Sequence, residues 1–329
     1  MKTLEQVRAT LAPYPIEVAF PDIARWRVGN GGVEYVHSFD SGVAGPHVMV
    51  MALTHGNEVS GAIAVDALLS KGVRPRCGRL TLAFGNVAAY QRFNPEDIDA
   101  TRYLDEDMNR VWDPARLDGP EDSMELRRAR ALRPIVDSVD LLLDIHSMHE
   151  EAPPVMMCGA LDKGLTFAAQ VGVPEVLVAD AGHTNGRRLR DYGGFGDPAS
   201  PRNAVLIETG QHVSLRSRDV ALDVTARFLL AVGSVEREDL AEFLSEAALA
   251  PQRALRVTEP VVAQSMDFAF VDDYRGMELI PKAGTVIARE PGREVVTPYD
   301  NCVLVQPSLR HLGPGVTMVR LAKVLPCGA

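Results

Sequence analysis

Short apolar runs alternate with segments of helical periodicity from Val48 to Thr209. The runs are rich in Val, Ile and Leu, and several are apolar at nearly every position, as in strands that are buried on both faces of a sheet. The predicted strands are Val48 to Leu53, Leu80 to Phe84, Leu141 to Ile145, Val155 to Cys158, Val176 to Ala179 and Ala204 to Ile207. Apolar residues that recur every three or four positions predict helices at Glu58 to Leu69, Ser123 to Leu132, Leu161 to Val171 and Asp219 to Val232. This order of strands and helices predicts an α/β fold with a mostly parallel sheet.

The hydrophobic pattern changes towards the C-terminus. Ser234 is expected to cap a further helix that ends at about Ala248. From residue 252 onwards, short apolar runs and turn clusters replace the helical periodicity. The chain is therefore predicted to form an α/β domain over residues 1–251 and a small all-β domain over 252–329.

Two further segments differ from this alternation. Residues 1–12 interleave charged side chains with apolar ones at helical spacing, unlike the apolar core of a secretory signal, so we expect a cytoplasmic protein. The loop from Gly182 to Pro201 is rich in Gly, Arg, Asp and Pro and is long for a compact domain. Loops of this length are often binding loops.

The charge of the chain limits its partners. There are 34 Lys and Arg against 44 Asp and Glu, a net charge of −10. Nucleic acid and anionic membrane surfaces attract basic patches, so neither is expected as a partner. No apolar stretch approaches the roughly 20 residues that span a bilayer. The chain has four cysteines, at Cys77, Cys158, Cys302 and Cys327. No C-x-x-C spacing occurs among them, which argues against a disulfide scaffold or a thiolate metal site. We therefore expect all four to be reduced.

The most distinctive motif is Thr-His-Gly-Asn-Glu at 54–58, directly after a predicted strand and at the start of a helix. His55 and Glu58 can therefore face one point above the C-terminal end of a parallel sheet, which is where such sheets bind ligands. Asp-Ile-His-Ser at 144–147 ends another apolar run and offers His146. Two histidines and a glutamate, with a fourth position left for water, are typical of catalytic zinc. Asp144 is a candidate for orienting one of these ligands.

Each half of this pattern has a plainer interpretation. A His and a Glu at this spacing occur by chance in many chains. His146 alone would more simply be a buried histidine at a strand end. The metal hypothesis rests on both motifs together and on their position at strand ends.

Two arginines eight positions apart lie in the segment 101–110, which has no clear periodicity. Arg102 and Arg110, with Asn109 beside the second, suit the recognition of carboxylate oxygens because a guanidinium offers paired donors. Taken alone, the segment is better explained as a solvated loop in which these arginines pair with Asp105, Glu106 or Asp107.

Glu208 stands at the end of the predicted strand Ala204 to Ile207, in the sequence Ile-Glu-Thr-Gly. An acid in that position is unusual unless it faces water, an arginine or a site. At the same sheet edge as a metal, it could accept a proton from water and return it to a leaving amine. A turn acid at a strand end is the competing explanation.

Taken together, these four motifs resemble the succinylglutamate desuccinylase and aspartoacylase family, in the same order and at similar spacing, over roughly residues 45–325. The family is similar to the zinc carboxypeptidases. The resemblance implies a three-layer α/β/α domain with a mostly parallel mixed sheet, followed by a small all-β domain. We interpret this β domain as structural, either a lid or an oligomer contact.

The resemblance also implies a role for each matching residue. His55, Glu58 and His146 match ligands of one zinc ion per subunit, and Glu208 matches the general base and acid. The resemblance further assigns polarisation of the scissile carbonyl to Arg102, substrate-carboxylate binding to Asn109 and Arg110, and closure of the pocket to Tyr299.

The chain also departs from the family pattern. The family uses a further arginine to bind the second carboxylate of the acyl group. Here several arginines compete for that role, namely Arg187, Arg188, Arg190 and Arg202. The segment after His146 is atypical, and we interpret His149 and Glu150 as rim residues.

The resulting hypothesis is a zinc-dependent hydrolase that cleaves the amide of a small N-acyl amino acid or a related carboxylate. A homo-oligomer is compatible with this hypothesis. One alternative is a carboxypeptidase-like peptidase with the same metal site. Another is a non-catalytic protein that binds a metal or a carboxylate, although such a protein would have no need of Glu208 as a base.

Overall fold

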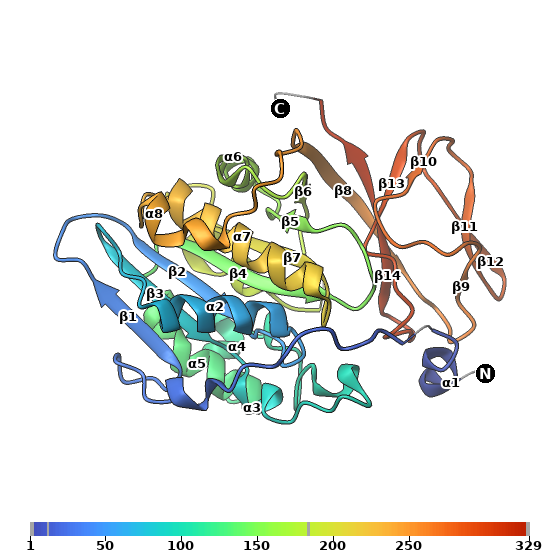
Figure 1. Ribbon diagram of the computed structural model, residues 1–329. Helices are drawn as coiled ribbons and strands as arrows, with labels where there is room; N and C mark the ends of the chain where they lie inside the picture. Colours follow the sequence, from blue (N-terminus) through green and yellow to red (C-terminus); the bar gives the residue numbers. More distant parts are fainter. Residues whose placement is uncertain (1–2, 12, 183–184, 327–329) are drawn as a thin grey trace.

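The computed structural model describes residues 3–11, 13–182 and 185–326. Within them, the largest sheet has eleven strands in the order β1-β3-β2-β4-β7-β5-β6-β8-β14-β13-β10 (Figure 1). Its strands are β1 Val36–Asp40, β2 His47–Ala52, β3 Arg79–Phe84, β4 Leu141–Met148, β5 Val155–Met157, β6 Val176–Ala179, β7 Asn203–Gln211, β8 Arg253–Val262, β10 Leu279–Ile280, β13 Cys302–Val305 and β14 Thr317–Val324. A second sheet, in the order β12-β11-β9, contains β9 Ala269–Phe270, β11 Val286–Glu290 and β12 Arg293–Val296.

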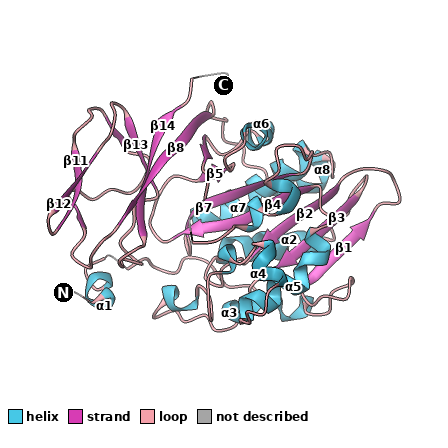
Figure 2. Ribbon diagram, turned by 180° about the vertical axis from the view of Figure 1, so that it is seen from behind, coloured by secondary structure: helices cyan, strands magenta, loops and turns pink. Residues whose placement is uncertain are grey.

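Helices cover both faces of the first half of the sheet (Figures 1 and 2). One core joins these strands to α2, α6 and α7, and a second joins them to α4 and α5 on the opposite face. The α-helices are α1 Leu4–Arg8, α2 Val59–Lys71, α3 Val87–Tyr90, α4 Pro114–Asp118, α5 Met124–Val136, α6 Asp162–Val171, α7 Leu215–Ala231 and α8 Arg237–Leu240. Short 3-10 helices are η1 Ile23–Trp26, η2 Ile98–Thr101, η3 Met108–Arg110, η4 Leu189–Asp191, η5 Gly193–Phe195 and η6 Ala241–Phe243.

All six predicted strands and the four central helices are present, so the three-layer α/β fold is confirmed. Strands β2, β3, β4 and β7 are parallel neighbours, which brings their C-terminal ends to one edge. The helical spacing predicted for residues 1–12 corresponds to the short helix α1. Residues 1, 2 and 12 lie outside the described part of the chain.

The helix predicted from Ser234 to Ala248 is wrong. The chain forms only the short turns α8 and η6 there, and Leu244 already has an extended backbone. The reason is that few apolar positions in this segment are buried, and Leu240 is the main one. A short amphipathic segment with so little packing gains too little to continue as a helix.

Within residues 252–326, the C-terminal region consists of strands and turns, as predicted. Its first strand, β8, pairs in parallel with β6, so this region extends the main sheet from its first residues. The long antiparallel pair β8 and β14 then leads to the separate three-stranded sheet. Val7 of α1 packs into the apolar core of this region, so the N-terminal helix lies against the C-terminal strands (Figure 2). The domain boundary at 251/252 stays a prediction.

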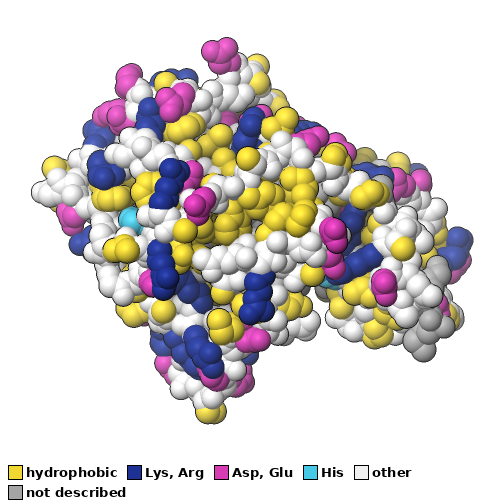
Figure 3. Space-filling model, turned by 60° about the horizontal axis from the view of Figure 1, so that its bottom comes forward, with side chains coloured by type: hydrophobic (Ala, Val, Ile, Leu, Met, Phe, Trp, Pro, Cys, Tyr) yellow, Lys and Arg dark blue, Asp and Glu magenta, His cyan; other side chains and the backbone are white. Residues whose placement is uncertain are grey.

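Acidic and basic side chains are interspersed around the face shown in Figure 3, with apolar atoms at its centre. Of the cysteines, Cys158 and Cys302 are buried, Cys77 is partly buried, and Cys327 lies outside the described residues. None of the helices in the described part of the chain combines the length and the apolar character that a bilayer crossing requires.

Candidate active site

The turn between β2 and α2 carries the first two site residues. Leu53 has a left-handed backbone (φ 58°), which turns the chain sharply at the end of the strand. At Gly56 an added Cβ would lie 2.5 Å from the carbonyl oxygen of Thr101, so only glycine fits. The Gly56 amide donates to the Arg102 carbonyl at 2.9 Å. This turn therefore presents His55 and Glu58 and is tied to the loop that carries Arg102.

Strands β4 and β7 carry the other two residues. His146 and Glu208 are register partners in this parallel pair, so their side chains leave the sheet on the same face. Immediately after His146 the register shifts, and the regular pairing ends. Both side chains therefore stand where the sheet opens into the cavity.

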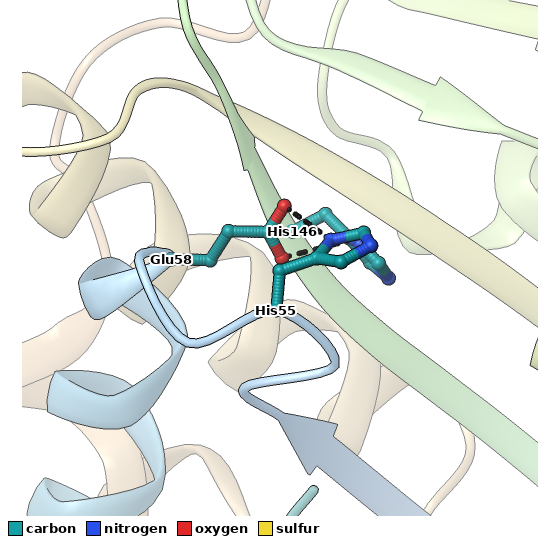
Figure 4. A group of neighbouring side chains, drawn as sticks. All are labelled: His55, Glu58 and His146. Carbon is teal, nitrogen blue, oxygen red and sulfur yellow. Dashed lines mark hydrogen bonds and ion pairs between the residues drawn. The ribbon is translucent and has the colours of Figure 1, made fainter. Parts of the chain in front are cut away.

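The side chains of His55, Glu58 and His146 point towards one another (Figure 4). Each offers a ligand atom, and these atoms lie within 4.8 Å of one another. Glu58 Oε1 is 2.8 Å from His55 Nδ1, and Glu58 Oε2 is 3.0 Å from His146 Nδ1. All three residues are at most 2% exposed.

The contacts of His146 fit a metal better than a hydrogen-bonded cluster. Its Nε2 lies 2.9 Å from Asp144 Oδ2, yet neither this contact nor the one to Glu58 Oε2 is aligned as a hydrogen bond. Glu58 Oε2 and His146 Nε2 are thus buried without a hydrogen-bond partner. Leaving buried polar atoms unsatisfied is costly. A cation at the centre of the three residues would satisfy Glu58 Oε2, whereas the Nε2 atom of His146 faces Asp144.

Each histidine has an aspartate at its second nitrogen. Asp107 Oδ1 lies 2.8 Å from His55 Nε2, and Asp144 Oδ2 lies 2.9 Å from His146 Nε2. Asp144 is itself held by the hydroxyl of Thr54, which donates at 2.9 Å. Carboxylates in this position orient ligand histidines and raise their basicity.

The acidic and imidazole groups of this cluster each stabilise the charged form of the other. Burial alone would raise the pKa of Glu58, but His146 and His55 outweigh it and hold that pKa well below its usual range. Burial alone would lower the pKa of His146, but Asp144 and Glu58 raise it well above its usual range. A positive charge between Glu58 and the two aspartates is therefore favoured at this cluster, and a metal ion would supply one.

Glu208 differs from Glu58 in its surroundings. Burial raises the pKa of Glu208 to about 7, and Glu58 adds to the increase, while His146, a hydrogen bond from Gln306 and Arg102 oppose it. Its Oε2 atom is buried and has no hydrogen-bond partner. A carboxylate that titrates near neutrality suits a general base and acid.

The segment 101–110 is not the solvated loop that its charges alone suggest. Asp107 is the acid that pairs with both arginines, at 3.2 Å from Arg102 Nη2 and 3.8 Å from Arg110 Nη2. It lies between them and His55, so the pairing is part of the site. Asn109 is 4% exposed, and its Oδ1 accepts from the Leu189 amide at 3.0 Å.

These residues surround a cavity of about 660 Å³ that reaches into the C-terminal region. Besides the three ligand candidates, Glu208, Arg102, Asn109 and Arg110 line it. Burial lowers the pKa of Arg110 to about 10, and Arg102, Arg320 and Arg188 lower it further, against the effect of Asp107. The guanidinium groups of Arg102, Arg110, Arg188 and Arg320 all line this cavity, and a bound anion would relieve their mutual repulsion.

The sequence model of a protein family, the succinylglutamate desuccinylase/aspartoacylase catalytic domain, matches residues 44–231 of this chain. The chain belongs to this family. A comparison with curated proteins found no match. Among solved structures, a family member from Rhodobacter sphaeroides has a TM-score of 0.65 at 18% identity and covers 89% of this chain and 90% of its own.

Two other solved structures have the same fold. Succinylglutamate desuccinylase from Vibrio cholerae has a TM-score of 0.64 at 17% identity, over 89% of this chain and 86% of its own. The ectoine utilization protein EutE (DoeB) from Ruegeria pomeroyi, solved with product bound, has a TM-score of 0.59 at 17% identity. The match covers 89% of this chain and 88% of that protein. These likenesses support the family fold.

One of the four arginines that were candidates for binding the acyl group lines the cavity. Arg188 lines the cavity, where it pairs with Asp180 and Asp191. The other three, Arg187, Arg190 and Arg202, do not line it.

Tyr299 is not brought to the site. It lies in the turn between β12 and β13, its hydroxyl is 2.6 Å from the Thr258 hydroxyl, and Lys323 covers its ring. It does not line the cavity, so its position gives no support to the predicted role in closing the pocket.

Two cavity residues from the C-terminal region were missed. Gln306 follows β13 in a left-handed conformation (φ 52°) and hydrogen-bonds Glu208. Arg320 in β14 lies near Asp180 and Gln306, each at 3.5 Å. No sequence motif marks either of them, because their part in the site depends on how the C-terminal strands fold back over the first half of the sheet.

Proposed function

We propose that this protein is a zinc-dependent deacylase that hydrolyses the amide bond of a small N-acyl amino acid or a related carboxylate. The observation that carries the proposal is the convergence of His55, Glu58 and His146 next to Glu208, in a cavity lined with arginines. Membership of a deacylase family supports the class of reaction.

Zinc suits the ligand set. Two imidazoles and one carboxylate, each buried and each oriented by further contacts, match the ligands of catalytic zinc. Zinc held by these residues would lower the pKa of a water molecule towards 7 and would polarise a carbonyl oxygen.

Glu208 supplies the proton transfers. Its free Oε2 can accept the proton of the attacking water, and the same group can then protonate the departing amine. The hydrogen bond from Gln306 holds the carboxylate in place.

The arginines orient the substrate. Arg102, whose Nη1 is 3.8 Å from Glu58 Oε1, lies next to the ligand cluster and can donate to the carbonyl oxygen as negative charge develops there. Arg110, with Asn109 beside it, faces the cavity further from the ligands and can hold the substrate carboxylate.

A substrate panel tests this proposal. We expect the purified protein to hydrolyse at least one N-acyl amino acid, detected as free amine, and to leave dipeptides intact. Cleavage of dipeptides alone would favour the peptidase alternative. Zinc binding without hydrolysis of any compound, including N-acetyl and N-succinyl amino acids, would favour the non-catalytic alternative.

Asp144→Asn is expected to weaken zinc binding about 10- to 100-fold, because an amide lacks the negative charge with which Asp144 raises the basicity of His146. Zinc affinity is measured by competition with a chelator of known strength. Asp140→Asn, near the start of the same strand and outside the cavity, is the control. Equal affinities in the wild type and Asp144→Asn would refute the orienting role.

Arg110→Gln is expected to raise KM about 10- to 100-fold with a smaller change in kcat, since it removes a charge-assisted contact with the substrate carboxylate. Steady-state kinetics measure both constants. Arg127→Gln, an exposed position on α5, is the control. An unchanged KM would mean that the carboxylate binds elsewhere.

The pH profile depends on Glu208. Because its pKa is raised to about 7, the carboxylate is protonated below that pH and cannot accept a proton. A bound cation nearby would lower the pKa. We therefore expect kcat/KM to fall on acidification with a midpoint at or below about 7 and to stay level above it. A midpoint above 8 would show that another group limits the reaction.

A further inference from the structure

A second group of histidines lies at the same cavity. His149 follows β4, three residues after His146, and His311 lies in the loop between β13 and β14. Both line the cavity. Asp99 of η2 and the buried His212 complete the group. Four distant parts of the chain are thus brought together, and the proposed hydrolysis uses none of these residues.

The contacts within this group are short. His149 Nδ1 is 2.8 Å from Asp99 Oδ1 and 3.1 Å from His212 Nε2. On the other side of the ring, His149 Nε2 is 3.0 Å from His311 Nε2. Asp99, His149 and His311 each offer one ligand atom, and these atoms lie within 4.8 Å of one another.

We propose that Asp99, His149 and His311 form a second binding site for a divalent transition metal, separate from the His55, Glu58 and His146 site. Two imidazoles and one carboxylate are a ligand set for zinc and for other metals of the first transition row. The site shares no residue with the first one and opens into the same cavity, so an ion can reach it from solvent.

The state of the imidazoles favours binding. Burial, together with nearby cations, lowers the pKa of both His149 and His311 below the usual range. A neutral imidazole is the form that ligates a metal. The carboxylate of Asp99 supplies a negative charge beside them.

Protons can hold the same group together when no metal is bound. Arg8 Nη2 lies 3.2 Å from His311 Nδ1 and can only donate, so His311 carries its proton on Nε2. That Nε2–H donates to His149 Nε2, and the Nδ1–H of His149 then donates to Asp99. For His311 to ligate a metal through Nε2, its proton must move to Nδ1, and Arg8 must turn away. Asp99 and His311 contact opposite nitrogens of His149, so the His149 ring must also turn until the nitrogen without a proton faces the ion and the N–H faces away from it. The metal-bound state therefore competes with the Arg8 contact.

Counting zinc tests the second site independently of any activity. The full-length protein is stripped with a chelator, equilibrated with excess Zn²⁺, desalted and analysed by elemental mass spectrometry. We expect two zinc ions per chain in the wild type, one in His311→Gln, one in Asp99→Asn and one in His55→Ala. His37→Gln, in β1 and outside the cavity, is expected to keep two.

Two results would overturn the proposal. One is a single zinc ion in the wild type that His55→Ala removes and His311→Gln does not. The other is two zinc ions that both persist in His311→Gln and in Asp99→Asn. Circular dichroism verifies the fold of each variant, and having two different ligand variants keeps the test valid if one of them misfolds.

Arg8→Gln provides a test in the opposite direction. It removes a positive charge and the fixed donor at His311 Nδ1, so we expect a calorimetric zinc titration to show about 10-fold tighter binding at the second site, with the first site unchanged. Weaker binding at the second site would contradict the proposed competition.

Discussion

Glu208→Gln is expected to lower kcat for amide hydrolysis by about 10²- to 10⁴-fold, the usual contribution of a positioned acid and base. Glutamine has nearly the same shape as glutamate, so the hydrogen bond with Gln306 and the packing around β7 can persist. It cannot accept a proton from water, and it has none to give to the leaving amine. Zinc content is expected to stay at the wild-type value, because Glu208 is not among the ligand candidates.

Kinetics and elemental analysis of the same Glu208→Gln preparation separate the two effects. Glu294→Gln, an exposed residue of β12, is the control for a lost carboxylate. Turnover within about threefold of the wild type would refute the assigned role of Glu208. A loss of zinc together with turnover would instead place Glu208 among the ligands.

His55→Ala is expected to lower the zinc content by one ion per chain and to reduce hydrolysis to background. It removes one of three protein ligands and leaves the buried Glu58 and the partly buried Asp107 without the imidazole that lies 2.8 Å from each. The two remaining ligands cannot hold the ion in competition with water, because catalytic zinc keeps three protein ligands.

Elemental analysis and the hydrolysis assay, applied to His55→Ala and His37→Gln in parallel, measure this effect. Wild-type zinc content in His55→Ala would refute the ligand assignment. Normal hydrolysis after the loss of that zinc would show that the reaction does not need it.

Local sequence patterns predicted the layers of the fold well. Continuous apolar runs such as Val176 to Ala179 are strands at the expected positions, because only a strand buried on both faces tolerates such a run. The segment from Ser234 to Ala248 failed for the opposite reason, since its weak periodicity has little core to pack against. The edge strand β1 was missed because its side chains are only partly buried and carry little hydrophobic signal.

The site was predictable where its chemistry is local. His55 and Glu58 share one turn, and His146 and Glu208 end neighbouring strands, so periodicity and strand ends were enough to suggest that they meet. The position of Asp107 between two arginines at the site was not predictable, because a run of charges in a loop usually faces water. Gln306, Arg320 and His311 come from beyond residue 300, and their place in the cavity depends on tertiary packing that no local pattern encodes.

Metal removal and reconstitution test the central claim most directly. Hydrolysis of the best N-acyl amino acid is measured in the protein as purified, after chelation, and during titration with Zn²⁺. We predict that chelation abolishes hydrolysis and that zinc restores it in the wild type but not in His55→Ala. Full hydrolysis by protein shown to be free of metal would contradict the account.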